Sequence, residues 1–137
     1  MGDTASFVEI EHTADWAIRV RGATVPELFV NAAAGMYSLI ADLGSVAPTL
    51  ERVVSVKGVD AEALLVNWLN ELVYYTEMDG LVFCEFRIIS FESTHLCATA
   101  RGGRGAPLRK QIKAVTFHNL RITLTDDGYE ATIVFDV

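Results

Sequence analysis

Titratable residues gather at two places in this chain, and both could contribute to a metal site. The first is the run Glu11-His12-Thr13-Ala14-Asp15, between two stretches that alternate like strands. The second is the end of the sequence, where Asp136 precedes Val137 and its carboxylate. Carboxylate oxygens suit Ca²⁺, Mg²⁺ and Mn²⁺, so Asp15 or Glu11 beside this end would complete a divalent-cation site. Spacing alone leaves a second interpretation open, in which the 11–15 run is a solvated turn, the end of the chain is a solvated terminus, and neither binds a metal.

Two of the three histidines are candidate general bases. His12 lies within the first run, and His118 ends a predicted strand, whereas His95 lies on an alternating strand and is more typical of a structural residue. No serine or cysteine occupies a nucleophile-elbow pattern, so a catalytic triad is not predicted. A metal-dependent phosphoester hydrolase that uses these histidines with the aspartates therefore remains an alternative function.

Basic residues cluster in one glycine-rich stretch, which we call the basic segment, residues 101–113. Its members are Arg101, Arg104, Arg109, Lys110 and Lys113, with no acidic residue among them. The order of glycines and lysines does not match a P-loop. The segment could contact a phosphate or an acidic partner, or it could be a mobile hairpin tip.

Composition restricts the class of protein. The chain has 137 residues, which predicts one domain, 1–137. Its net charge of −7 argues against direct nucleic-acid binding, which needs clustered Lys and Arg. The two cysteines match no zinc pattern, and neither a signal peptide nor a membrane span is visible. We therefore expect a cytoplasmic protein with reduced thiols and no membrane contact.

Hydrophobic periodicity predicts an α+β fold, a largely antiparallel sheet with two amphipathic helices. Thr24 and Glu27 form a capping box for the first helix, and Asp60 caps the second. The predicted strands are 7–11, 16–21, 52–57, 81–91, 94–101, 112–118, 120–124 and 129–137, and the second helix is 61–78.

A strand–helix unit recurs after a shift of 36 residues, which places 20–24 on 56–60 and 28–31 on 64–67. This similarity fits an internal duplication, or the shared form of any strand–glycine–cap–helix junction. Along the second helix, a polar stripe fits a solvated face or a partner-docking face. The stripe consists of Asn67, Asn70, Glu71 and Tyr74.

The last hairpin is predicted to turn at Asp127-Gly128, because this dipeptide favours two-residue turns. Apolar residues then face apolar residues along both strands. This register would place Asn119 opposite Asp136 and His118 opposite Val137.

Four motifs together resemble the archease family, over nearly the whole chain and in order. They are residues 11–15 (EHTAD), 65–72 (LVNWLNEL), 112–118 (IKAVTFH) and 134–137 (VFDV). The sequence departs from the family at Phe117, where members often carry tyrosine. It also departs in the Arg/Gly-rich loop 101–110, which in many relatives is longer and more acidic.

The resemblance implies a protein cofactor, not an enzyme. Archease activates the RtcB-type RNA ligase of tRNA splicing by promoting guanylylation of the ligase and its multiple turnover, and it would meet RNA only through the ligase. The family's divalent-cation site (Ca²⁺, Mn²⁺ or Mg²⁺) maps to Asp15, Asp136 and Val137. Lys113 and His118 lie in a family motif, and Glu11 and His12 would tune the site. A chaperone-like binding module is a further alternative.

Overall fold

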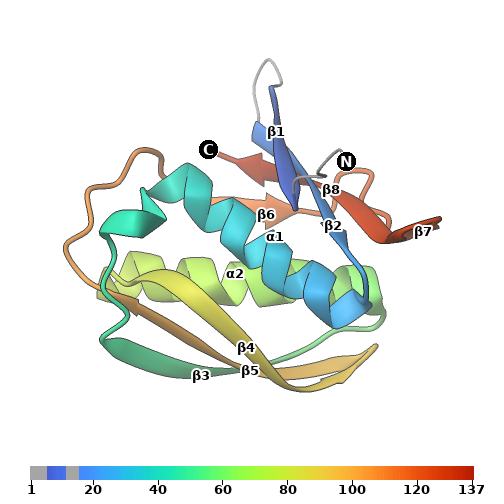
Figure 1. The fold of residues 1–137 in the computed structure, drawn as a ribbon, viewed down its shortest axis with the longest axis horizontal. Coiled ribbons are helices and arrows are strands. Elements are labelled where there is room, and N and C mark those ends of the chain that lie inside the picture. The colour runs from blue at the N-terminus through green and yellow to red at the C-terminus, as the bar shows by residue number, and fades with distance from the viewer. Residues whose placement is uncertain (1–5, 12–15) are drawn as a thin grey trace.

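Two helices lie between two antiparallel sheets in the computed structural model, which describes residues 6–11 and 16–137, with 10 and 11 as backbone only (Figure 1). The larger sheet has the order β1-β2-β8-β6, and β7 also pairs with β8. Its strands are β1 (Phe7–Glu11), β2 (Trp16–Gly22), β6 (Ala114–Thr116), β7 (Thr123–Thr125) and β8 (Gly128–Asp136). The smaller sheet has the order β3-β5-β4, with β3 (Leu50–Lys57), β4 (Val82–Glu92) and β5 (His95–Gly103). The predicted α+β class is confirmed.

Both helices begin at the predicted caps. The α1 helix (Val25–Ile40) follows Thr24, whose Oγ1 accepts a hydrogen bond from the Glu27 amide at 3.2 Å. The Glu27 carboxylate accepts a bond from the Ala23 amide, one residue before the position that a standard capping box uses. The α2 helix (Ala61–Asp79) follows Asp60, whose carboxylate accepts a bond from the Ala63 amide at 2.8 Å. A short 3₁₀ turn, η1 (Leu43–Ser45), follows α1.

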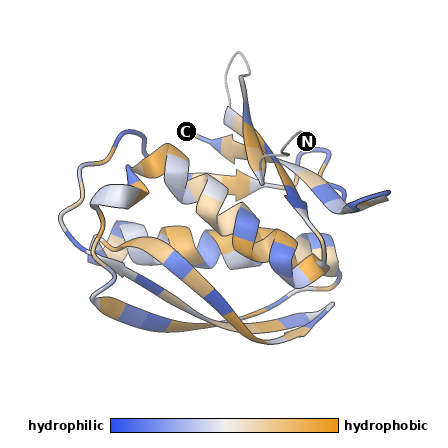
Figure 2. Ribbon diagram, in the orientation of Figure 1, coloured by the Kyte–Doolittle hydropathy of each residue, from blue (hydrophilic) through white to orange (hydrophobic). Residues whose placement is uncertain are grey.

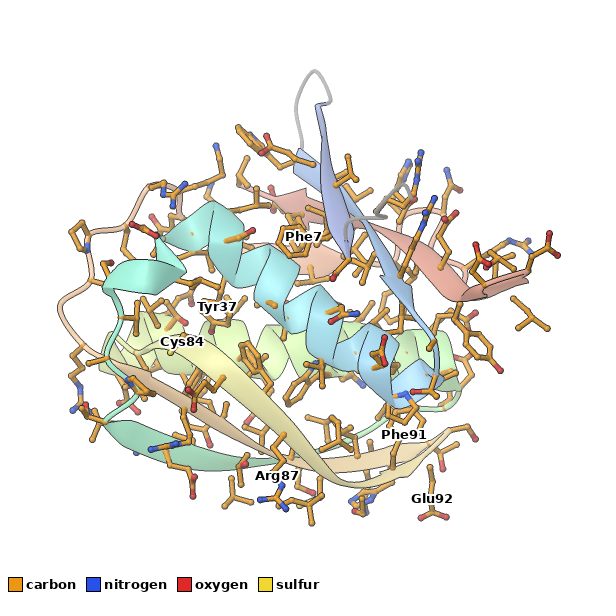
Figure 3. All side chains as sticks on the ribbon, in the orientation of Figure 1. Phe7, Tyr37, Cys84, Arg87, Phe91 and Glu92 are labelled. Atoms are coloured by element: carbon orange, nitrogen blue, oxygen red, sulfur yellow. The ribbon has the colours of Figure 1, made fainter. Side chains whose placement is uncertain are left out.

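The core forms where the helices meet the two sheets. The α1 helix packs on β2 and β4, and α2 packs on β3 and β6, so both helices are buried on more than one side (Figure 2). The buried side-chain polar atoms of the described residues have hydrogen-bond partners. The Trp68 indole donates to the Phe29 carbonyl at 3.0 Å. The hydroxyl of Tyr37, which is labelled in Figure 3, donates to the Leu72 carbonyl and bonds to the Thr76 hydroxyl. Burial raises the pKa of Tyr37 well above its usual value. The hydroxyl therefore stays protonated and can donate to the Leu72 carbonyl.

The two strand–helix units share their contacts as well as their sequence. The Asn31 side-chain amide donates to the Arg21 carbonyl at 2.7 Å, and the Asn67 amide donates to the Lys57 carbonyl at 2.7 Å. In both units a glycine lies against the first turn of the helix, as the last residue of β2 in the first unit and directly after β3 in the second. A Cβ on Gly22 would lie 2.4 Å from the Leu28 nitrogen, and one on Gly58 would lie 2.5 Å from the Leu64 nitrogen. These matching contacts support the duplication interpretation.

The predicted register of the last hairpin is wrong. The turn residues are Asp126 and Asp127, and Gly128 is paired with Thr125. A shift of two residues leaves every side chain on its original face, so the apolar alternation could not exclude it. Gly128 has φ of 135° and lies against the Gly22 carbonyl, where a Cβ would approach to 2.4 Å. This close approach requires glycine in the strand, next to the turn.

The strands before this turn are also shorter than predicted. Between residues 112 and 125, only Ala114–Thr116 and Thr123–Thr125 pair with β8, and the residues between these two strands leave the sheet. Within this excursion Leu120 is buried, and the Ile122 amide donates to the Glu62 carboxylate on α2 at 3.0 Å. Residues 117–122 are therefore held against α2. For this reason they do not continue the strand pairing with β8 that the apolar alternation predicted.

Candidate metal-binding tip

Strand β8 ends with Asp136 at one rim of the larger sheet, and we call Asp136 and the following Val137 the acidic tip. Phe135 is paired with Trp16 on one side and with Val115 on the other, and it is fully buried. The next residue, Asp136, is exposed and lies opposite Ala114, so the prediction that Asn119 lies opposite it is wrong. The Lys113 amide donates to the Asp136 carbonyl at 2.8 Å. The backbone of the tip is thus fixed on its β6 side, while the carboxylate of Asp136 is open to solvent.

Helix α2 fixes the short strand β6 that supports the tip. The Asn70 side chain donates to the Val115 carbonyl at 3.2 Å and accepts from the Val115 amide at 2.9 Å. One amide therefore satisfies both backbone groups of a residue at the sheet edge. Asn67 and Asn70 both bind neighbouring backbone, so half of the polar stripe on α2 has a structural role.

Part of the predicted site lies outside the described residues. Asp15 and His12 belong to 12–15, and Glu11 is described only as backbone, paired with Trp16 at the end of β1. The described part nevertheless determines where this segment starts and ends. Before it, the described chain ends at Glu11 in β1, and after it the chain resumes in β2 at Trp16, the cross-strand partner of Phe135.

His118 does not lie opposite Val137. Strand β6 runs from Ala114, opposite Asp136, to Thr116, opposite Val134, so the chain moves away from the tip before it reaches His118. His118 is exposed, and its ring Nε2 lies 3.4 Å from the Asn119 amide. Lys113 is exposed and adjacent to the tip through its backbone.

The arginines of the basic segment hold other parts of the protein. Arg101 lies 3.2 Å from Glu85 and donates to the Pro48 carbonyl. Arg104 donates to the Asp79 carbonyl at the end of α2 at 2.9 Å. Arg109 reaches the Asp42 carboxylate at 4.0 Å. These contacts favour a structural role over a phosphate-binding role for the three arginines.

The end of the basic segment connects helix α1 to the tip. The Arg109 amide donates to the Ile40 carbonyl at 2.6 Å, and the Lys110 ammonium lies 3.4 Å from the centre of the Trp16 ring. In Figure 1 the segment passes the end of α1 as an orange trace on its way to β6. In the sequence, Lys110 is only one of the five basic residues of the basic segment. The contact with Trp16 depends on the fold, because the two residues are far apart in the sequence.

The described residues give little support for a metal cluster elsewhere, a cysteine nucleophile or a membrane span. Among the described side chains, those of 6–9 and 16–137, no three of His, Cys, Asp or Glu gather closely enough to hold a metal by themselves. Cys84 and Cys97 are free thiols. Burial raises the pKa of the Cys84 thiol, and Glu85 raises it further, so this thiol is a poor nucleophile. No described helix is both long and apolar enough to cross a bilayer.

The fold and the tip define a small α+β protein whose last strand ends in an exposed aspartate. The chain belongs to the archease protein family, whose model matches residues 7–137. It is 38% identical over 136 residues to protein archease of Methanosarcina barkeri, covering 93% of each chain. It is 39% identical over 137 residues to protein archease of Saccharolobus islandicus, covering 96% of this chain and 99% of the relative.

Two solved structures share the fold. The solution structure of protein 1598 of Methanobacterium thermoautotrophicum has a TM-score of 0.78 and 30% identity, with 96% of this chain and 99% of that chain covered. The crystal structure of a Thermotoga maritima protein, described as an archease and possible chaperone, has a TM-score of 0.70 and 24% identity over 93% of this chain and 94% of that one.

Proposed function

We propose that this protein activates an RtcB-type RNA ligase of tRNA splicing, by bringing a divalent cation held at the acidic tip to the nucleotide site of the ligase. The proposal rests on membership of the archease family together with one structural observation. An aspartate is held at the exposed rim of the sheet, beside the strand that follows the 11–15 run. In this role the protein acts as a cofactor in the cytoplasm, and the ligase performs the chemistry.

The ligands in this proposal are Asp15, Asp136 and Val137. Asp15 directly precedes Trp16, and Asp136 directly follows Phe135, so each aspartate is one residue beyond the same cross-strand pair. The described members of the donor set, Asp136 and Val137, fit a hard cation, because the Asp136 carboxylate is exposed and forms no ion pair with a described residue. Oxygen-only donors favour Ca²⁺, Mg²⁺ or Mn²⁺ over zinc.

Bound there, the cation would supply positive charge where charge develops on phosphate oxygens during guanylylation. The protein itself holds the donors in place. The ladder with β2 and β6 fixes the backbone at Phe135 and Asp136, and the Asn70 amide fixes β6. The Lys113 backbone amide donates to the Asp136 carbonyl, and the Lys113 ammonium adds a positive charge at this rim of the sheet.

We expect the protein to increase the rate of guanylylation of an RtcB-type ligase when the two are mixed with GTP and Mn²⁺. The measurement is incorporation of labelled guanylate into the ligase histidine, with and without this protein, at sub-stoichiometric and equimolar ratios. The reason is that a preorganised cation at the tip lowers the electrostatic cost of displacing phosphate. A ligase rate that does not change at any ratio would contradict the proposed function.

The same assay addresses the alternatives. Turnover of nucleotides or phosphoesters by this protein alone would favour a metal-dependent hydrolase. The hydrolase interpretation loses support because His118, one of its two proposed bases, lies away from Asp136. A chaperone-like role through the α2 stripe loses support because Asn67 and Asn70 bind backbone of their own chain.

A further inference from the structure

Strand β3 forms an edge of the smaller sheet that no described strand covers. Its only partner among the described strands is β5, and in Figure 1 no other strand lies beside it. Three other strands at sheet edges are protected, because β4 carries two register shifts and β6 and β7 have three residues each. Strand β3, in contrast, pairs with β5 over eight residues without a bulge, and its Val53 is 61% exposed. A regular, partly apolar edge of this length can pair with another strand.

The ladder between β3 and β5 shows which backbone groups point to the open side. The Gly58 amide donates to the Thr94 carbonyl at 3.0 Å, one step beyond the last pair of the ladder. In an antiparallel ladder such bonds occur at every second pair, so the even-numbered residues of β3 bond to β5. The odd-numbered residues, 51 to 57, therefore direct their amides and carbonyls away from β5.

Two side-chain contacts agree with this orientation. The Asn67 amide donates to the Lys57 carbonyl at 2.7 Å, and the Arg52 guanidinium donates to the Glu51 carbonyl at 2.9 Å. These contacts lie at the two ends of the edge. The outward amides and carbonyls between them form no hydrogen bond with a described residue.

A groove runs beside the same edge, between β3 and helix α2. Of the α2 residues along it, Asn67 and Asn70 bind backbone of their own chain. Glu71, however, forms no ion pair with a described residue, and Tyr74 is 54% exposed. The groove has a volume of about 350 Å³ and is lined by Val56, Lys57, Asn67, Asn70, Glu71 and Tyr74. It thus offers a carboxylate and an aromatic ring to a cation.

The edge is complementary to itself. A two-fold axis brings β3 against β3 of a second copy in antiparallel order, with outward residues opposite outward residues. The registers of greatest overlap are centred on residue 53, 54 or 55. Only the register centred on Val54 places Glu51 opposite Lys57 of the second copy, and symmetry forms this pair of opposite charges twice.

The same register also brings Arg52 to the groove. It places Arg52 opposite Val56 of the second copy, on the face of the sheet that packs against α2. There the groove of the second copy presents Glu71 and Tyr74. Arg52 forms no ion pair with a described residue, so a charge-assisted contact with this carboxylate becomes available to both copies.

We propose that the protein forms a two-fold dimer through β3, in which Arg52 of each copy binds Glu71 of the other. The two smaller sheets join into one continuous sheet across the axis. Because one edge strand and one groove form the whole contact, the dimer is weak and depends on protein concentration. The acidic tip lies in the larger sheet, so this inference does not depend on the proposed metal site.

The test is sedimentation equilibrium of the full chain, from micromolar to millimolar concentration. We expect the mass of the wild-type protein to rise from one chain towards two. Arg52→Glu and Glu71→Arg should each raise the dissociation constant at least about tenfold, because like charges then meet at both contacts. The double variant Arg52→Glu/Glu71→Arg should return the dissociation constant to within about threefold of the wild type.

A second pair of variants tests the strand pairing itself. Ser55→Pro removes an amide that points away from β5, so it blocks the open edge without removing a bond of the ladder, and we expect a monomer. Ser55→Ala is the matched control, because both variants lose the contact with His95 and only the proline loses the amide. Glu9→Lys controls for net charge, since Glu9 is exposed on β1 in the larger sheet.

A mass of one chain at every concentration would overturn the proposal. An Arg52→Glu protein that dimerises as the wild type does would also overturn it, and so would equal weakening by Glu9→Lys. Recovery in the double variant supports the register, whereas a double variant weaker than both single variants would overturn it. If Ser55→Pro does not fold, the charge variants decide the question alone.

Discussion

Replacement of Asp136 by asparagine is expected to reduce stimulation of ligase guanylylation at least about tenfold, because it removes a charged metal ligand. The fold should remain intact. The Asp136 side chain is exposed and forms no ion pair with a described residue, so the free energy of unfolding should change by less than about 0.5 kcal/mol. The measurements are the guanylylation assay and urea unfolding of the same preparations.

A matched control lies at the other end of the same strand. Asp126→Asn removes the same charge from the exposed turn before β8, about 30 Å along the strand from the tip. This variant should stimulate the ligase as the wild-type protein does. Equal stimulation by Asp136→Asn and Asp126→Asn would contradict a functional role for the tip, and equal loss in both would indicate a general effect of net charge.

The second large effect is expected at Gly22, where replacement by alanine should destabilise the protein by about 3 kcal/mol. The added Cβ would lie 2.4 Å from the Leu28 nitrogen and 2.7 Å from its Cα, and backbone atoms of a helix cannot move aside as a side chain can. Strand β2 would then shift relative to α1. The measurement is the free energy of unfolding in urea.

Gly58→Ala should have a similar effect, because Gly58 holds the equivalent position in the second strand–helix unit, with the Leu64 nitrogen at 2.5 Å. Gly44→Ala is the control, since its Cβ would meet only the Asp42 carboxylate, at 3.4 Å. A Gly22→Ala protein as stable as Gly44→Ala would show that the strand–helix junction is not tightly packed.

Local signals in the sequence predicted most of the fold. Thr24 and Asp60 predicted both helix starts, because a side-chain oxygen there satisfies a free amide of the first turn. The division of the strands into two sheets was not predicted. Alternation shows which side chains share a face, and it does not show which strands pair.

The candidate site could be predicted only in part. Asp136 was identified from its residue type and its place in a family motif, but its neighbours were assigned through a register that is wrong by two residues. The same alternation supports both registers, and the choice depends on the contact between Gly128 and Gly22. The position of Lys110 over Trp16 depends on the path of the basic segment past α1, which no local pattern encodes.

The central claim is that the acidic tip binds a divalent cation. Its most direct test is a crystal structure of the protein soaked in Mn²⁺, with anomalous scattering used to locate the metal. We predict one anomalous peak within about 2.0–2.6 Å of carboxylate oxygens of Asp15, Asp136 and Val137, the range for oxygen ligands of Mg²⁺ and Ca²⁺. A well-ordered Asp136 without a peak beside it, at saturating Mn²⁺, would contradict the account.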